Sequence, residues 1–148
     1  MAYLDTEKYL NAVCRMIAGG ASQVPVPIRG DSMRPFLRSG DFAFLKALDG
    51  PLRPGDIVLY RRENGEYVLH RIYKITSDGT LLMLGDAQLT GEPISPDQVL
   101  GKAAFVTRAG QKIFPGEFVW WFFAQPWRLL GKNRKYASKI REKFRKKK

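Results

Sequence analysis

The 148-residue chain has the length of one domain, and its 45% hydrophobic and 26% charged residues are typical of a globular protein and exclude a disordered or fibrous one. Its net charge of +11 resembles a nucleic-acid signature, but ten of the 25 basic residues and only one of the 14 acidic residues lie in residues 131–148. Residues 1–130 are therefore almost neutral. We expect a folded domain with a basic tail, and the charge of the domain itself does not favour nucleic-acid binding.

Cysteine and histidine each occur once, as Cys14 and His70. An intrachain disulfide is therefore impossible, and neither residue type can supply a set of metal ligands by itself. We expect no metal and no organic cofactor. Charged residues interrupt the first apolar stretch, so we expect neither a cleavable signal peptide nor an N-terminal anchor. With no convincing membrane-spanning stretch elsewhere, the sequence favours a cytoplasmic or peripheral membrane protein.

The first 20 residues show the spacing of an amphipathic helix, which Gly19-Gly20 should end. The apolar residues that recur at helical spacing are Tyr9, Val13, Met16 and Ile17.

From residue 24 onward the chain changes to short apolar runs rich in Val, Ile, Phe and Tyr, which predicts a mainly β domain. The segment Glu63–Glu66 contains an Asn-Gly pair that favours a tight turn, so the strands on either side should pair antiparallel. The expected strands lie around Val24–Arg29, Phe42–Leu48, Asp56–Arg62, Tyr67–Ile75, Thr80–Leu84 and Val99–Thr107.

Ser32 follows the first expected strand directly, in the segment Gly30-Asp31-Ser32-Met33-Arg34-Pro35. A serine on such a turn can project its hydroxyl toward a substrate, although Asp31 or Ser32 could instead cap a short helical turn. Arg34 stands where the α/β-hydrolase motif has its second glycine, so the segment is not that motif.

His70 lies on the apolar face of the expected strand 67–75, together with Val68 and Ile72. A lone histidine in such a place is most often a core residue that is bonded to the backbone. Considered separately, neither Ser32 nor His70 establishes a catalytic site.

Taken together, the two segments resemble the signal-peptidase and LexA-type serine peptidase superfamily, whose serine lies in a Gly-x-Ser-Met-x-Pro segment. The resemblance covers about residues 24–107 in the same order. It includes Ser39-Gly40-Asp41, Pro54-Gly55-Asp56-Ile57-Val58, Val68-Leu69-His70-Arg71-Ile72, Gly85-Asp86 and Val99-Leu100-Gly101-Lys102. It implies an antiparallel β domain of the signal-peptidase/LexA type, with Ser32 as the nucleophile.

His70 stands where most of that superfamily has a lysine, and its strand resembles that of the endoplasmic-reticulum, archaeal and spore-former signal peptidases. The resemblance implies that His70 is the general base. A base works best when its pKa is near the operating pH, and an imidazole with an ordinary pKa of about 6.5 needs no shift, whereas a lysine at about 10.4 does. We therefore expect activity to rise with pH through a pKa of about 6–7.

Two carboxylates are candidates for orienting the imidazole. Asp86, in the Gly-Asp segment, is slightly preferred, and Glu92 stands near the place where the eukaryotic-type enzymes have an aspartate. The backbone N–H of Ser32 is expected to contribute to the oxyanion hole, and the hydroxyl that many bacterial relatives add two residues earlier is missing at Gly30. Met33 is expected either in the substrate groove or in the core.

All three tryptophans lie in residues 118–130, just before the basic tail. This stretch is too short to span a bilayer, which takes about 20 residues, and Pro126 and Arg128 weaken it further. Two interpretations remain. The stretch packs on the β domain, or it binds an anionic membrane surface together with the tail, because Trp and Phe beside a cationic segment suit anionic headgroups. RNA or DNA binding by the tail ranks below both.

The sequence thus predicts an N-terminal helix (1–20), a peptidase domain (21–117) and an aromatic segment with a basic helical tail (118–148). The resemblance implies an endopeptidase that cleaves an extended leader or signal-like peptide through an ester on Ser32, with small side chains favoured beside the cleaved bond. A maturation peptidase dedicated to one leader-bearing peptide is an alternative. A non-catalytic module of this fold and a LexA-type regulator that cleaves itself at Ala18-Gly19 are two others.

Overall fold

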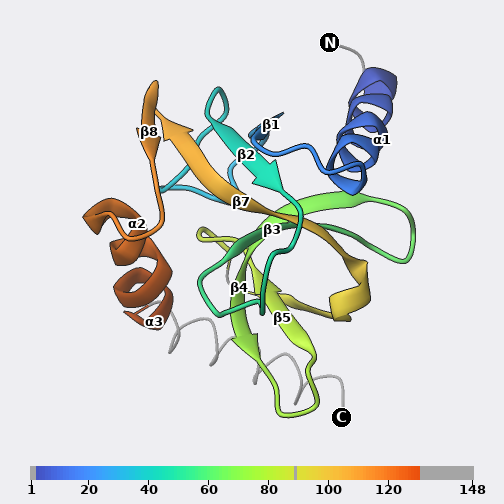
Figure 1. Ribbon diagram of the computed structural model, residues 1–148. Helices are drawn as coiled ribbons and strands as arrows, with labels where there is room; N and C mark the ends of the chain where they lie inside the picture. The colour runs from blue at the N-terminus through green and yellow to red at the C-terminus, as the bar shows by residue number, and fades with distance from the viewer. Residues whose placement is uncertain (1–2, 89, 131–148) are drawn as a thin grey trace.

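The computed structural model describes residues 3–88 and 90–130, so the basic tail lies outside the described residues (Figure 1). Helix α1 (Tyr3–Ala18) precedes the strands, and a helical segment follows them. The strands are β1 (Val24–Pro27), β2 (Phe42–Lys46), β3 (Ile57–Arg61), β4 (Tyr67–Ile75), β5 (Leu81–Leu84), β6 (Glu92–Ile94), β7 (Val99–Arg108) and β8 (Gln111–Ile113). The short helices are η1 (Pro96–Gln98), α2 (Phe118–Phe122), the π-helical turn η2 (Phe123–Trp127) and α3 (Arg128–Leu130).

The strands form one antiparallel sheet in the order β1-β2-β7-β3-β4-β5-β6, with β8 paired to β7. This confirms the prediction of a mainly β fold with an N-terminal helix. The Asn-Gly turn joins β3 to β4 in an antiparallel pair, as expected, and sets Val58 opposite His70. Strands β6 and β8 were not expected from the sequence, because three residues are too few to show an alternating pattern.

Helix α1 ends at Ala18, next to the two glycines that were expected to stop it. It packs on the sheet through Val13 and Ile17, which are at most 3% exposed. Gly101 of β7 allows this close approach, since a Cβ there would lie 3.2 Å from the Ile17 side chain and 2.9 Å from the Lys46 carbonyl oxygen. Met16 departs from the expected apolar face and is 45% exposed.

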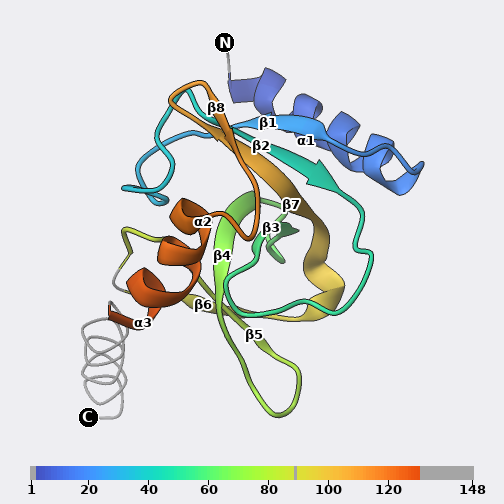
Figure 2. The ribbon, with the colours of Figure 1, turned by 60° about the vertical axis from the view of Figure 1, so that its left-hand side comes forward.

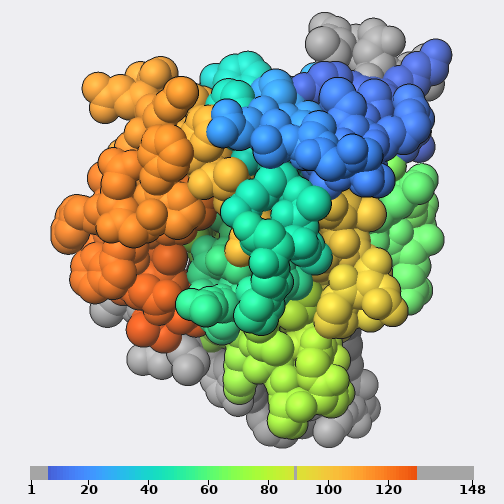
Figure 3. Space-filling model, in the orientation of Figure 1, coloured from blue at the N-terminus to red at the C-terminus, as the bar shows by residue number. Residues whose placement is uncertain are grey.

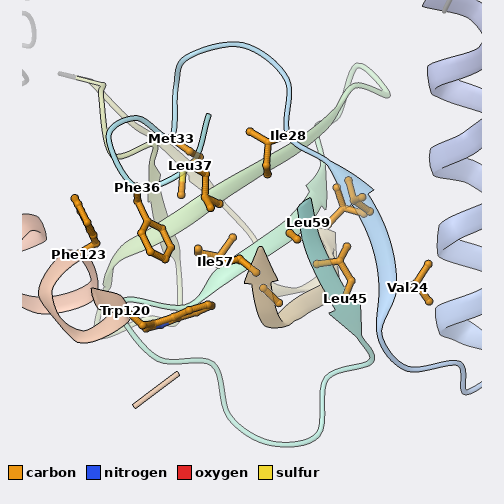
Figure 4. Close-up of a cluster of buried hydrophobic side chains, with 14 of the residues drawn as sticks. Val24, Ile28, Met33, Phe36, Leu37, Leu45, Ile57, Leu59, Trp120 and Phe123 are labelled. Atoms are coloured by element: carbon orange, nitrogen blue, oxygen red, sulfur yellow. The ribbon is translucent and has the colours of Figure 1, made fainter. Parts of the chain in front are cut away.

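Helix α1 and the C-terminal helical segment (α2, η2 and α3) lie on opposite flanks of the sheet in both ribbon views (Figures 1 and 2). In the space-filling view, α1 (blue) and the chain that follows β7 (orange) form separate corners of the molecule (Figure 3). One buried apolar cluster nevertheless connects them. Figure 4 shows Val24 and Leu45 at one end of this cluster, and Phe36, Trp120 and Phe123 at the other.

The aromatic segment before the tail is partly core and partly surface. Trp120 and Phe123 are buried, and their rings lie 5.7 and 5.0 Å from the ring of Phe36. Phe118 is 72% exposed and Trp121 is 50% exposed. Within residues 3–88 and 90–130, none of the helices has the length and apolar character needed to cross a membrane.

Candidate active site

The serine loop, residues 30–37, follows β1 and carries Ser32. It begins at Gly30, whose φ of +73° is a conformation that glycine adopts without strain. The side chains that anchor the loop in the core, each at most 2% exposed, are Met33, Phe36 and Leu37. The loop therefore presents the Ser32 hydroxyl from a fixed base.

His70 faces this loop from β4, and its Nε2 atom lies 3.0 Å from Oγ of Ser32. This distance is within the hydrogen-bond range that proton transfer from a nucleophile to its base requires. His70 is 6% exposed, so the imidazole is almost fully shielded from solvent. The structure thus brings together the two residues that the sequence analysis singled out, 38 positions apart in the chain.

Tyr60, on the neighbouring strand β3, lies behind the imidazole. Its hydroxyl oxygen is 3.5 Å from Nδ1 of His70, the long limit of a hydrogen bond, and donates to Oε1 of Glu92 at 2.5 Å. Because the single phenolic proton goes to Glu92, the oxygen can only accept from Nδ1. A proton on Nδ1 leaves Nε2 free to accept the proton of the Ser32 hydroxyl.

Arg62 fixes the far end of this chain of contacts. Its Nε atom lies 2.9 and 3.1 Å from the two carboxylate oxygens of Glu92. Burial raises the pKa of Glu92, but the hydrogen bonds from Arg62 and Tyr60 outweigh burial and leave the pKa below its usual value. Burial and the contact with Glu92 raise the pKa of Tyr60. At neutral pH the pair is a carboxylate and a protonated phenol.

The His70 environment lowers the pKa of the imidazole to about 4. Burial is the main cause, and the positive charge of Arg62 adds to it, while the Glu92 carboxylate opposes both. The expectation of an unshifted pKa near 6.5 is therefore wrong. The apolar face of the strand pointed to a buried His70, but it did not show how far burial and the charge of Arg62 would lower the pKa.

Asp86 lies in a different network. Its Oδ1 and Oδ2 atoms accept hydrogen bonds from Nε and Nη2 of Arg71 at 2.8 and 2.9 Å, and both side chains are at most 3% exposed. The turn that carries Asp86 also supports the serine loop, since the Ala87 N–H donates to the Ser32 carbonyl oxygen at 2.9 Å. Gly85 is needed there, because a Cβ would lie 2.4 Å from that oxygen. This segment holds Ser32 in place through the backbone.

A groove with a volume of about 550 Å³ runs from the Ser32–His70 pair toward α1. Its walls are mostly apolar and include Val26, Ile28, Met33, Leu59 and Leu69. Two strand edges border it. Among the described residues, β1 pairs only with β2, and residues 67–70 of β4 pair only with β3, so each strand has an open edge. Open edges of this kind can pair with an extended peptide.

A family model for S24-like peptidases matches residues 1–104. The chain belongs to the S24-like peptidase family. No match was found among curated proteins. The S24-like match includes Ser32, His70, Tyr60 and Glu92, and it ends before β8 and the C-terminal helical segment. It indicates a serine peptidase or a LexA-like regulatory module, since the family has catalytic and non-catalytic members.

The contacts in this site change which of the two candidate carboxylates, Asp86 or Glu92, is preferred for orienting the imidazole. Asp86 was slightly preferred from the sequence, but Arg71 binds its carboxylate, whereas Glu92 contacts the imidazole through Tyr60. The geometry thus favours Glu92 for the orienting role. Tyr60 and Arg62 were not among the residues expected at the site. The Asn-Gly turn could have indicated both residues. It sets the β3–β4 register and so places residues 58, 60 and 62 on the face that carries His70.

The remaining expectations of the S24-like site concern Met33 and the oxyanion hole. Met33 is 2% exposed and therefore a core residue, and it also borders the groove. Its contact with a substrate stays a prediction. Gly30 supplies no side-chain hydroxyl. The role of the Ser32 N–H as an oxyanion donor stays a prediction.

Proposed function

We propose that the protein is a serine endopeptidase that uses Ser32 as nucleophile and His70 as general base. The observation that carries the proposal is the 3.0 Å contact between Oγ and Nε2. Oγ would attack the carbonyl carbon of the scissile bond while its proton moves to Nε2. The imidazolium would then protonate the leaving amine, and water would hydrolyse the ester on Ser32 with His70 again as base.

The low pKa of His70 affects both halves of this cycle. A neutral imidazole is available throughout the neutral pH range, since the pKa is about 4. The imidazolium formed during the attack lies beside the Tyr60–Glu92 pair, whose carboxylate opposes its positive charge. An acid with a low pKa also gives its proton readily to the leaving amine. Glu92 would therefore act as a positioning residue through Tyr60.

The proposed substrate is an extended peptide of the leader or signal-like class. The apolar groove and its two open strand edges support an extended peptide, because backbone pairing binds such a chain with little dependence on its side chains. The leader or signal-like class rests on the resemblance to signal peptidases. The resemblance to signal peptidases implies small side chains at the cleavage site. A dedicated maturation peptidase for one leader-bearing peptide would use the same geometry.

Self-cleavage of the LexA type is less well supported. The Ala18-Gly19 bond lies at the end of α1, where the Gly19 N–H donates to the Arg15 carbonyl oxygen at 3.0 Å and the Gly20 N–H to that of Ile17. The bond is therefore part of a hydrogen-bonded turn. A self-cleaving chain would have to release this turn, together with the buried Ile17, before the bond could reach Ser32.

The proposal includes a location at the surface of an anionic membrane, through residues 118–148. The exposed rings of Phe118 and Trp121 lie 5.8 Å apart, and the basic tail, residues 131–148, begins ten residues after Trp121. Trp120 and Phe123 are core residues and are not available for this contact. Phe118 and Trp121 would therefore be the inserting side chains.

The test of the peptidase proposal is a mass-spectrometric profile of cleavage in a library of 14-residue peptides. The full-length chain should cut a subset that shares small side chains at the cleavage site, and Ser32→Ala should cut none of it. Peptides that both proteins cut would identify a contaminating peptidase. A library left intact by the wild-type chain would favour the non-catalytic module.

A further inference from the structure

Helix α1 crosses the end of the groove that lies away from Ser32. Tyr9 and Leu10, half-buried residues of the helix, line the groove together with residues of β1 and β4. Hydrogen bonds tie the helix to both walls. The Tyr9 hydroxyl donates to the Pro25 carbonyl oxygen on β1, and the Tyr67 hydroxyl on β4 donates to Oδ1 of Asn11.

The open edge of β1 is chemically one-sided. Pro25 and Pro27 have no N–H. Their carbonyl oxygens point away from β2, because backbone groups alternate along a strand and the residues that pair toward β2 are Val26 and Ile28, whose N–H donates to the Asp41 carbonyl oxygen. A peptide on this edge must therefore donate its own N–H groups. Tyr9 already occupies the Pro25 oxygen, so Pro27 is the outward carbonyl of β1 that a peptide can reach.

The β4 wall of the groove sets the length of strand edge with which a peptide can pair. The four residues from His70 back to Tyr67 are separated by three steps of extended chain, which span about 10 Å at roughly 3.3 Å per residue. At Tyr67 the wall meets the helix through Asn11. An extended peptide with its scissile bond at Ser32 thus has space for about four residues before it reaches α1.

We infer that α1 is the end wall of the substrate groove, so that about four residues on one side of the scissile bond pair with the strand edges and the rest of the peptide must turn away. The inference rests on the proposed function and adds a specificity element to it. Tyr9 is its key residue, since its ring and hydroxyl close the β1 edge. The wall is fixed in place, because Val13 and Ile17 hold the helix in the core.

A backbone N-methyl scan of one peptide that the full-length chain cleaves tests the end wall. An N-methyl group removes one N–H and so prevents pairing at that residue. On the flank that enters the groove, methylation should lower kcat/KM at least tenfold within about four residues of the cleaved bond and have no effect beyond. In Tyr9→Ala, which frees the Pro25 oxygen, the sensitive stretch should extend by about two residues.

Two variants control for general effects on the helix. Met16→Ala changes an exposed residue of α1 and should leave the wild-type pattern unchanged, and Tyr9→Phe, which keeps the ring, should extend the stretch less than Tyr9→Ala. A sensitive stretch that is longer than six residues in the wild type, or that Tyr9→Ala does not lengthen, overturns the end wall while the peptidase proposal stands. If no library peptide is cleaved, or Ser32→Ala cleaves equally, the proposed function fails and the inference fails with it.

Discussion

The Tyr60 hydroxyl donates to Oε1 of Glu92 across 2.5 Å, and this contact sets the direction of the hydrogen bonds that lead to Ser32. Because the Tyr60 hydroxyl donates its own proton to the Glu92 carboxylate, its oxygen can only accept from Nδ1 of His70, which lies 3.5 Å away. Nε2 is then left to accept from the Ser32 hydroxyl. A phenol thus stands where serine peptidases with a direct triad have the carboxylate.

Tyr60→Phe tests this role, because it keeps the ring in the core and removes only the hydroxyl. The Nδ1 proton would lose its acceptor, and we expect kcat to fall about 10- to 100-fold with little change in KM, in line with the loss of one hydrogen bond to a developing charge. Steady-state kinetics with a library-selected peptide measure the change. Glu92→Gln should add little to Tyr60→Phe in the double variant, and fully additive losses would show that the two residues act separately.

The single histidine makes the pKa of the base directly measurable. The ring nitrogen and carbon resonances of His70 should titrate with a midpoint near pH 4, because burial disfavours the imidazolium. Activity needs the neutral base, so it should be flat from about pH 5.5 to 8 and fall as the pH drops toward 4. A midpoint at 6–7, with activity rising between pH 5.5 and 7.5, would restore the ordinary imidazole that the sequence suggested.

The two charges nearest His70 should move this midpoint in opposite directions. Removing the Arg62 charge in Arg62→Gln should raise the pKa of His70, and removing the Glu92 charge in Glu92→Gln should lower it. The same NMR titration measures both shifts. If neither variant moves the midpoint, burial alone sets it and the Tyr60–Glu92 connection has no electrostatic part.

Asp86→Asn should act on stability. It leaves the Arg71 guanidinium buried without its counter-charge, and breaking one partner of a buried pair costs about 3–5 kcal/mol. Glu92→Gln should cost much less, because the Glu92 and Arg62 side chains are about one-third exposed. Urea unfolding of both variants measures the difference. An Asp86→Asn protein with wild-type stability and greatly reduced turnover would return the orienting role to Asp86.

Membrane attachment predicts that full-length protein floats with anionic phosphatidylserine–phosphatidylcholine vesicles at low salt and less so at high salt, since each basic residue near the surface contributes about 1 kcal/mol. The double variant Phe118→Ser and Trp121→Ser should lose the salt-resistant part of binding. Met16→Ser and Leu48→Ser, which change exposed apolar residues elsewhere, should not. Equal flotation of both double variants would rule out insertion of the aromatic pair.

The sequence predicted the strands of four residues or more, because each is a run rich in apolar and β-branched or aromatic residues between turn residues. Burial alternates along β1 and most of β7, whereas Ile57–Tyr60 of β3 are buried on both faces. It also predicted that Ser32 and His70 meet, through the resemblance to known peptidases. It did not predict the Tyr60–Glu92 contact, because β6 has only three residues and its position depends on packing against β5. The dual character of residues 118–130 was equally hidden, since helical packing on Phe36 decides which aromatic side chains are buried.

The most direct test of the account is kcat/KM for one library-selected peptide in Ser32→Ala, His70→Ala and the double variant. If Oγ and Nε2 act as one unit across their 3.0 Å contact, each single change should lower kcat/KM on the order of 1,000-fold or more, and the double variant should be no worse than either. Wild-type activity in Ser32→Ala, or losses that multiply in the double variant, would contradict a serine–histidine peptidase.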